Sequence, residues 1–242
     1  MTLSEFTFAC QAAFNQNGME CTEAQAEKLF LLTNRMLEVN QSMNLTAITE
    51  ENAVILRHYV DSLMISKKIP EGASVIDVGC GAGFPSLPLA IFRPDLRITA
   101  LDGTAKRIRY VEETANMLGL DNVIAIAGRA EEYGVNPAYR EKFDVATARA
   151  VANLRVLCEL CLPFVRVGGT MLSMKSQQAK EELADAGNCI SLCGGVMTEF
   201  LAEHLIDSEG NREERNLIVL EKRSKTPKIY PRHFSKISKK PL

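Results

Sequence analysis

The chain of 242 residues is 46% hydrophobic and 24% charged and has a formal net charge of −2, which favours one large globular domain, or one domain with an extension. No apolar run approaches the roughly 18 residues of a membrane helix, and the N-terminal residues lack the basic and apolar regions of a signal peptide. The seven cysteines are an odd number in a chain without a secretion signal, which is typical of reduced thiols. We therefore expect a cytoplasmic protein that does not bind a membrane.

Apolar residues at helical spacing predict three helices before the first strand. The first is expected to be capped by Ser4 and to stop at Asn17-Gly18. A capping box formed by Thr22 and Gln25 begins the second, and the third runs from about Asn52 to Ser66. We assign residues 1–66 to an N-terminal helical extension, which could pack over a cofactor or widen a substrate surface.

The third expected helix carries a polar cluster, since His58, Asp61 and Ser62 stand at i, i+3 and i+4 on one face. His58 could act as a base, or Asp61 as a metal ligand. Such a cluster is more often a hydrogen-bonded inner face, and we favour that interpretation. No further carboxylate or second histidine lies at ligand spacing nearby, so the sequence predicts no metal site.

Residues 75–89 are the stretch around which the chain is organised, and they read V-I-D-V-G-C-G-A-G-F-P-S-L-P-L. The apolar residues at the start predict a buried parallel strand. Gly79, Gly81 and Gly83 follow directly and allow a sharp turn that brings the backbone close to a ligand. Pro85 and Pro88 suit the first turn of a helix. An open α/β sheet builds a nucleotide site from strand, glycine turn and helix in this order.

The spacing of the glycines and the acidic residue Asp102 indicate the kind of nucleotide. The G-x-G-x-G spacing lacks the third glycine of the dinucleotide fingerprint, because position 84 is Phe, and no P-loop lysine follows. Residues 97–101 alternate like a strand and lead to Asp102, 19 residues after Gly83. A carboxylate there can accept hydrogen bonds from both hydroxyls of a ribose. The pattern resembles the cofactor site of class I S-adenosylmethionine (AdoMet) methyltransferases; the alternative is a glycine turn without a ligand.

Strands and helices alternate through the rest of the chain, which predicts an α/β fold. Thr104 is expected to cap a helix that ends near Leu118, residues 154–164 form another helix, and Ser176 caps a third. Gly168-Gly169 is expected to turn into the strand that delivers Lys175. Further strands are expected at 123–127, 143–148, 170–174, 196–206 and 217–220. This order suits the seven-stranded mixed sheet of a Rossmann-like class I methyltransferase, and we assign residues 67–223 to that AdoMet-binding domain.

Several motifs that would indicate other chemistry are incomplete. Residues 136–139 resemble the N-P-P-Y motif of enzymes that methylate amines, but they precede the fourth strand, which that motif should follow, so we interpret them as a turn. No Pro-Cys dipeptide supplies a thiolate for pyrimidine C5 chemistry. The cysteines at 158, 161, 189 and 193 could be imagined as a zinc site, but Cys158 falls among leucines of a helix, where cysteine behaves as a small apolar residue.

The C-terminal residues 222–242 are strongly basic. Eight of the 28 Lys and Arg residues lie there, whereas all 30 acidic residues lie in the rest of the chain. The segment also holds three prolines together with Tyr230, His233 and Phe234, a mixture that suits binding along RNA. The alternatives are a solvated tail and a tail that folds back on the acidic body. We assign residues 224–242 to this basic C-terminal tail.

Motifs along nearly the whole chain from about residue 25 resemble the RsmG (GidB) family of methyltransferases. The F-P pair after the glycines is a specific element of this resemblance. Two positions depart from the family pattern, because Cys80 stands where Ser is usual and Ser86 where Gly is usual. Both residues are small, so we expect weak effects on the turn. The matching segments are 44–48, 57–58, 61–63, 77–85, 106–107, 129–131, 148–151, Lys175, 228–232 and 241–242.

The resemblance implies an enzyme that uses AdoMet to methylate N7 of one guanine in the 530 loop of 16S ribosomal RNA. Its substrate would be the rRNA, the small ribosomal subunit or a precursor, and we expect a monomer that does not bind DNA. The resemblance places Arg129, Lys175 and Arg215 at the mouth of the active site, and we expect these residues and Arg149 to position the substrate. Cofactor contacts are expected from Gly79, Gly81, Gly83, Phe84, Asp102, Ala130, Glu131 and Arg149.

The absence of an evident acid–base pair agrees with this chemistry, because guanine N7 has a free lone pair and needs no general base. Alignment of the reacting groups can by itself be worth up to ~7–11 kcal/mol. The alternatives are an AdoMet methyltransferase that acts on another RNA, a protein or a small molecule, and an RNA-binding module that keeps AdoMet without turnover. Methyl transfer to ribosomal RNA distinguishes these possibilities.

Overall fold

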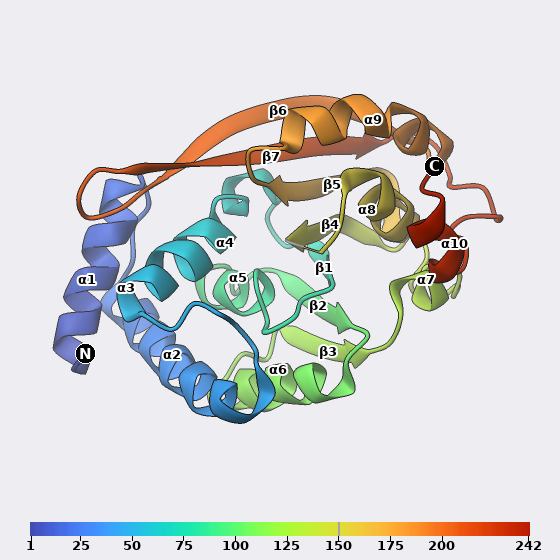
Figure 1. Ribbon diagram of the computed structural model, residues 1–242. Coiled ribbons are helices and arrows are strands. Elements are labelled where there is room, and N and C mark those ends of the chain that lie inside the picture. Colours follow the sequence, from blue (N-terminus) through green and yellow to red (C-terminus); the bar gives the residue numbers. More distant parts are fainter. Residues whose placement is uncertain (150) are drawn as a thin grey trace.

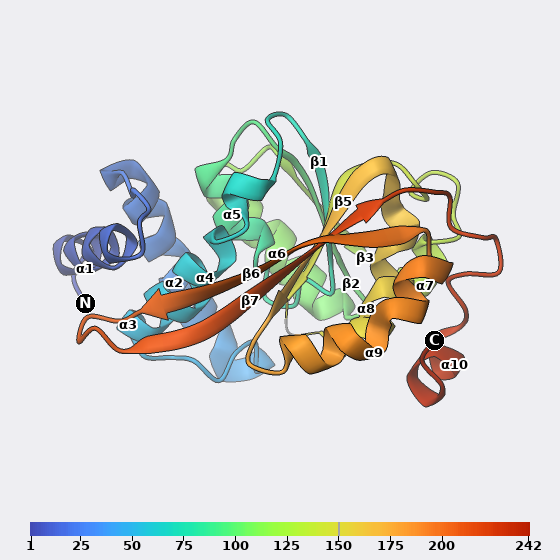
Figure 2. The same cartoon turned by 90° about the horizontal axis from the view of Figure 1, so that it is seen from above.

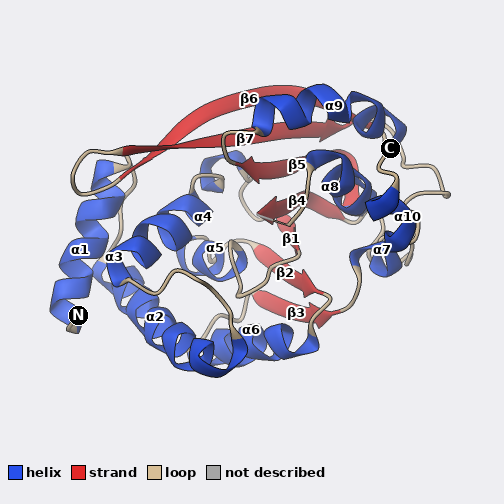
Figure 3. Ribbon diagram, in the orientation of Figure 1, coloured by secondary structure: helices blue, strands red, loops and turns tan. Residues whose placement is uncertain are grey.

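A seven-stranded sheet forms the centre of the molecule in the computed structural model, which describes residues 1–149 and 151–242 (Figures 1 and 3). Ala150, part of the family-like segment 148–151, lies outside the described residues. The strand order is β3-β2-β1-β4-β5-β7-β6, and the expected mixed sheet is confirmed, because β1 to β5 are parallel and β7 is antiparallel to both neighbours. The strands are β1 Ser74–Val78, β2 Arg97–Asp102, β3 Val123–Ala127, β4 Phe143–Arg149, β5 Val165–Lys175, β6 Gly195–Ile206 and β7 Arg212–Lys222.

Helices cover both faces of the sheet, and each face has its own apolar core. On one face of the sheet, α5 and α6 pack on β2 and β3, and the N-terminal helices pack on the outer side of α5. On the opposite face α8 packs on β4 and β5, and α9 packs on β6 and β7. The helices are α1 Leu3–Gln16, α2 Glu23–Met43, α3 Glu51–Val54, α4 Asp61–Leu63, α5 Ser86–Phe92, α6 Ala105–Met117, α7 Ala130–Tyr133, α8 Leu154–Cys161, α9 Ala179–Leu192 and α10 Phe234–Lys239.

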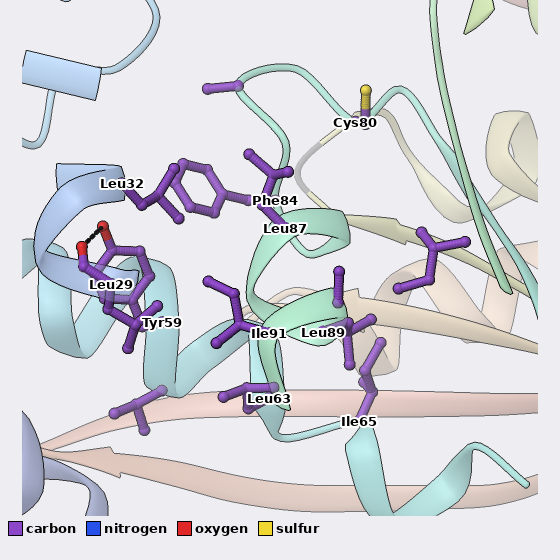
Figure 4. Close-up of a cluster of buried hydrophobic side chains, with 14 of the residues drawn as sticks. Leu29, Leu32, Tyr59, Leu63, Ile65, Cys80, Phe84, Leu87, Leu89 and Ile91 are labelled. Atoms are coloured by element: carbon purple, nitrogen blue, oxygen red, sulfur yellow. Dashed lines mark hydrogen bonds between the residues drawn. The ribbon is translucent and has the colours of Figure 1, made fainter. Parts of the chain in front are cut away.

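The N-terminal helices share one core with the sheet. Figure 4 shows Phe84 of the glycine loop reaching toward Leu32 of α2, with Tyr59 and Leu87 in the same group of buried side chains. The Tyr59 hydroxyl lies 2.6 Å from the Thr33 hydroxyl, so the polar end of this ring is satisfied inside the core. The residues assigned to an extension are therefore continuous with the core on the α5 and α6 face.

The start of α1 differs from the expectation that Ser4 caps it. Thr2 is the N-cap residue, because its hydroxyl accepts a hydrogen bond from the Glu5 amide and the Glu5 carboxylate accepts one from the Thr2 amide at 2.7 Å. This is a capping box, and its two reciprocal bonds outweigh a single serine cap two residues further on. Ser176 likewise does not cap α9, which begins at Ala179 after Gln178, and the helix starts without a side-chain cap.

The helix expected from about Asn52 to Ser66 is present, but its central part is not α-helical. Ile55–Val60 form a π-helical segment between α3 and α4, and a 3₁₀ turn covers Ser66–Lys68. Such segments are rare and are found mostly as single wide turns within α-helices. Here the wide turn lies immediately before Asp61.

Two strands are longer than the sequence indicated. Gly168-Gly169 lie inside β5, which begins at Val165, and a bulge between β4 and β5 accommodates the extra residues there. Gly168 has φ +82°, which only glycine adopts without strain. β7 begins at Arg212 and pairs with β6 in a long hairpin whose far end meets α1, as Figure 2 shows. The Asn17 side chain donates to the Ile206 carbonyl at 2.9 Å and accepts from its amide at 2.8 Å.

The basic tail folds back on the body of the protein. Tyr230 is buried, whereas Ile229 and Phe234, which the fold-back alternative also named, are exposed. The Arg140 guanidinium donates to the carbonyl oxygens of Thr226 and Tyr230 at 2.6 and 2.9 Å. Six of the eight basic side chains remain exposed, namely those of Arg223, Lys225, Lys228, Lys236, Lys239 and Lys240.

The other two basic residues of residues 222–242 are used inside the protein. The Lys222 ammonium group is buried, and it donates to the Leu162 carbonyl at 2.6 Å and to the Thr226 hydroxyl. Burial lowers the pKa of Lys222 to about 8. Arg232 pairs with Glu159 of α8, whose side chain is fully buried. The tail is thus part of the folded structure, as the fold-back alternative expected, and Lys222 and Arg232 are engaged inside the protein, whereas RNA binding by the six exposed basic residues stays a prediction.

Candidate cofactor and substrate site

The site lies where the strand order reverses, between β1 and β4. From β1 the chain continues through β2 to β3 at one edge and then returns to place β4 on the other side of β1. Open α/β sheets bind ligands at the carboxyl ends of the strands at such a point. A cavity of about 540 Å³ is present there, lined by the glycine loop, the ends of β2 and β4, and the π-helical segment. Its volume is in the range of about 300–1,000 Å³ that is typical of small-molecule sites.

The glycines of the loop serve different purposes. Gly81 has φ +57°, and a Cβ atom there would meet no protein atom within 4 Å, so its backbone borders open space in the cavity. Gly83 has φ +86°, and a Cβ atom would approach Leu87 Cδ1 to 2.6 Å. Gly81 therefore leaves room for a ligand, whereas Gly83 is required for the packing of the loop against α5.

Asp102 ends β2 and faces the glycine loop. Its Oδ2 accepts a hydrogen bond from the Gly81 amide at 3.1 Å, and its Oδ1 accepts one from the Thr104 amide at 2.8 Å. Thr104 is the N-cap residue of α6, as expected, but its hydroxyl makes no capping hydrogen bond. Each carboxylate oxygen has a second lone pair, so Asp102 can still accept from a ribose hydroxyl. The open space at Gly81 and the acceptors of Asp102 fit the ribose of AdoMet.

Asp77, at the end of β1, is fully buried beneath the loop. Its Oδ2 accepts hydrogen bonds from the Ser86 amide at 3.2 Å and from the Ser86 hydroxyl. Burial raises the pKa of Asp77 to about 6. The serine at position 86 is therefore more than a small residue of the turn, since it supplies one of the donors to a buried carboxyl group.

Three side chains stack at the wall of the cavity. The rings of His58 and Phe84 are parallel within 9° at a centroid distance of 4.4 Å, and the Arg149 guanidinium carbon lies 5.3 Å from the Phe84 centroid. His58 Nε2 is 2.9 Å from the Thr46 hydroxyl, and its Nδ1 is 3.4 Å from an Arg149 nitrogen. His58 and Asp61 thus belong to a hydrogen-bonded inner face as expected, whereas the buried Ser62 hydroxyl of the same cluster has no hydrogen-bond partner among the described residues.

The environment of His58 fixes its protonation. Burial and the neighbouring Arg149 charge lower the pKa of His58 to about 3. The imidazole is therefore neutral at physiological pH, and Nδ1 accepts from Arg149 while Nε2–H donates to Thr46. A neutral ring whose two nitrogens are both engaged serves to hold Arg149 in place.

This shift predicts a specific loss of stability in mild acid. Below the ordinary pKa of about 6.5 the unfolded chain binds a proton at His58 and the folded chain does not, so stability falls as the pH decreases. Between pH 7.5 and 5.5 the free energy of unfolding should fall by about 1.4 kcal/mol more in the wild type than in His58→Gln. Urea unfolding of both proteins at the two pH values measures the difference. An equal change in the free energy of unfolding in the two proteins would contradict the lowered pKa of His58.

A second cavity of about 450 Å³ adjoins the first and shares Asp61, Arg149, Val151 and Arg215 with it. Lys175, at the end of β5, also lines it. The Lys175 ammonium group donates to the Ala152 carbonyl at 2.5 Å and pairs with Glu182 at 2.7 Å. Two arginines and one lysine thus lie around a space at the ends of β4 and β5.

The structure gathers most of the residues that the sequence indicated. Gly79, Gly81, Phe84, Asp102 and Arg149 line the first cavity, and Arg149, Lys175 and Arg215 line the second. Gly83, Arg129, Ala130 and Glu131 line neither cavity. Glu131 is buried, and the Arg129 guanidinium lies beside Gly103, the residue that follows Asp102.

Two carboxylates hold the cations of the site; sequence reasoning missed Glu182, and it considered Asp61 as a metal ligand or as part of a hydrogen-bonded inner face but did not find its arginine partners. Asp61 binds Arg149 and Arg215, and Glu182 binds Lys175. The signal for Asp61 was its place beside His58 on one helical face, but its partners lie 88 and 154 residues further along the chain. No local pattern connects residues that are so far apart.

The cysteines do not form a group that could bind zinc. All seven are free thiols with buried side chains. Among the described residues, no group of three or more His, Cys, Asp or Glu side chains is arranged to hold a metal ion. Nor does any helix in residues 1–149 and 151–242 have the length and apolar character needed to cross a membrane.

The fold and the site together define a class I AdoMet-dependent methyltransferase, as the sequence predicted. Solved structures with this fold include TYW2 from M. jannaschii in complex with AdoMet, at 15% identity and a TM-score of 0.51 over 67% of this chain and 76% of that chain. A SAM-dependent methyltransferase from Aquifex aeolicus matches at 18% identity and a TM-score of 0.51 over 69% of this chain and 92% of that chain. These similarities show the fold, and the cofactor is AdoMet.

Sequence relatives give the particular family. The family model of rRNA small subunit methyltransferase G (GidB) matches residues 25–218. "Ribosomal RNA small subunit methyltransferase G" of Leuconostoc citreum is 43% identical over 96% of this chain and 97% of its own length. The protein of the same name from an Exiguobacterium species is 42% identical over the full length of both chains. The chain belongs to the rRNA small subunit methyltransferase G (GidB) family, and the resemblance seen in its motifs is confirmed.

Proposed function

We propose that this protein transfers a methyl group from AdoMet to N7 of a guanine in the 530 loop of 16S ribosomal RNA. It acts in the cytoplasm, as a monomer, on the small ribosomal subunit or a precursor of it. The proposal rests on two adjoining cavities. The Asp102 carboxylate, proposed to bind the ribose, borders the first cavity, and the cations of Arg149, Lys175 and Arg215 border the second. The relatives that are similar over the full length carry the name of a small-subunit rRNA methyltransferase, which supports the RNA substrate.

The first cavity holds the cofactor. Asp102 accepts from the ribose hydroxyls, the open backbone at Gly81 gives room for the ligand, and Phe84 forms an apolar wall. AdoMet supplies a methyl group on a positively charged sulfur, which a nitrogen lone pair can accept without first losing a proton. The protein's own contribution is to hold the two reactants in line and to exclude water.

The second cavity takes the target base. Arg149, Lys175 and Arg215 border it and provide N–H donors for a phosphate or for O6 of a guanine, which leaves the N7 lone pair free for the methyl group. No residue of this group is required as a base, and the neighbouring His58 has both ring nitrogens engaged. The six exposed basic side chains of the tail add sequence-independent attraction to the RNA backbone.

Methylation mapping tests the proposal. We expect 16S rRNA from cells that lack this protein to lose one N7-methylguanine in the 530 loop, and the purified protein with labelled AdoMet to restore it. Naked rRNA and isolated small subunits, assayed side by side, identify the form of the substrate. Label that appears in another RNA, in protein or in a small molecule would overturn the choice of substrate, and AdoMet binding without any methyl transfer would overturn the enzymatic function.

A further inference from the structure

Asp61 connects the two cavities. It is the first residue of α4, directly after the π-helical segment, and its side chain is 10% exposed. Its Oδ2 accepts a hydrogen bond from Arg149 Nη1 at 2.9 Å, and its Oδ1 accepts one from Arg215 Nε at 2.9 Å. Asp61, Arg149 and Arg215 all line both cavities.

The two arginines come from different parts of the fold. Arg149 ends β4 on the parallel side of the sheet, and Arg215 lies on β7, which runs antiparallel to its neighbours. Each has a further contact of its own, because Arg149 Nη1 also donates to the Arg57 carbonyl at 2.9 Å and Arg215 pairs with Glu213 at 3.2 Å. Asp61 is the carboxylate that these two cations share.

Two guanidinium groups this close repel each other, and the repulsion grows as water is excluded. A carboxylate that gives one oxygen to each group cancels part of the charge and restricts both side chains to one arrangement. An arginine has five N–H donors, so a partner that occupies some of them leaves others for a nucleotide. Asp61 therefore has the geometry to hold Arg149 and Arg215 at a fixed separation at the junction of the two cavities.

We propose that Asp61 is a positioning residue for the target guanine, acting through Arg149 and Arg215. This inference rests on the function proposed above. Asp61 does not accept a proton or touch the reacting atoms. It keeps the two arginines where they orient the nucleotide against the methyl donor, so that its loss harms alignment more than it harms RNA binding.

Asp61→Asn tests this inference in the full-length protein, with steady-state methylation of small subunits or their RNA as the assay. We expect kcat to fall about 10- to 100-fold, as for the loss of a charge-assisted hydrogen bond. The KM for RNA should stay equal or decrease, because the site gains one positive charge. A smaller folded fraction would also lower the apparent kcat at unchanged KM, so the melting temperature of Asp61→Asn is measured as well and kcat is expressed per folded protein.

Glu213→Gln is the matched control. It removes a different carboxylate from Arg215, one whose side chain is 33% exposed and also pairs with Arg57, and we expect kcat to change by less than about threefold. Asp61→Glu keeps the charge but displaces it by one methylene group, and should give an intermediate kcat at an unchanged melting temperature. If Asp61→Asn does not fold, Asp61→Glu decides the question.

The outcomes separate this inference from the proposed function. A wild-type protein that methylates no small-subunit RNA overturns both. An active wild-type protein together with Asp61→Asn at wild-type kcat, or with a decrease in RNA affinity at unchanged kcat, overturns the role of Asp61 alone. If Asp61→Asn does not fold, a wild-type kcat in Asp61→Glu also overturns the role of Asp61.

Discussion

Asp102→Ala is expected to weaken AdoMet binding at least about 100-fold, because two charge-assisted hydrogen bonds to the ribose, each worth ~1.5–3 kcal/mol, disappear. The substitution also removes the acceptors of the Gly81 and Thr104 amides. Asp102→Asn should have a smaller effect, since it retains one acceptor oxygen. Isothermal titration calorimetry gives the affinities, and the melting temperature reports the state of the loop.

Asp121→Asn is the control for charge, because Asp121 is an exposed residue before β3. Its AdoMet affinity should equal that of the wild type. An unchanged affinity in Asp102→Ala would remove Asp102 from the cofactor site. A wild-type melting temperature together with a large loss of affinity would show that the effect lies in the ligand contact.

The second large effect is expected at the contact between the tail and the body. Glu159 of α8 is fully buried and accepts three hydrogen bonds from Arg232, from Nε at 2.8 Å, from Nη2 at 2.6 Å and from the backbone amide at 2.9 Å. The hydrogen-bonded Glu159 carboxylate raises the pKa of Arg232. Arg232→Gln leaves a buried carboxylate without its cation, and such a change costs about 3–5 kcal/mol of unfolding free energy.

Lys236→Gln makes the same change of charge on an exposed residue of the tail and should leave the stability almost unchanged. Urea unfolding at neutral pH compares the two variants. AdoMet affinity should remain normal in both as long as they are folded, because the cofactor cavity does not include this contact. If Arg232→Gln unfolds at the same urea concentration as Lys236→Gln, the tail is not an essential part of the fold.

Much of the fold was predictable because its signals are local. The strand at Val123–Ala127 has the predicted bounds, and the glycine loop and Asp102, which lie within fewer than thirty residues of sequence, line one cavity. The capping box at Thr22 and Gln25 begins α2 as expected. In each case neighbouring residues make the decisive interactions.

The remainder depends on contacts between distant segments. Gly168-Gly169 looked like a turn, but β5 pairs with β4 on both sides of these residues, which lie at a bulge within the strand. Lys222 belongs to a basic run by sequence, and yet the fold buries it against Leu162 and Thr226. The ion pairs of Asp61 join three elements that only the sheet order brings together. Local patterns carry no information about such pairings.

The π-helical segment Ile55–Val60 sets the helical phase of the residues that enter the site. A single residue advances an α-helix by about 100°, and a π turn holds one residue more than an α turn. Deleting one residue from this segment would convert it to an α-helical turn and change the direction in which the residues inside it point relative to Asp61. His58 and Asp61 would then no longer face the cavity together. Insertions and deletions should therefore be tolerated much less in this short segment than in the loop that joins β6 to β7.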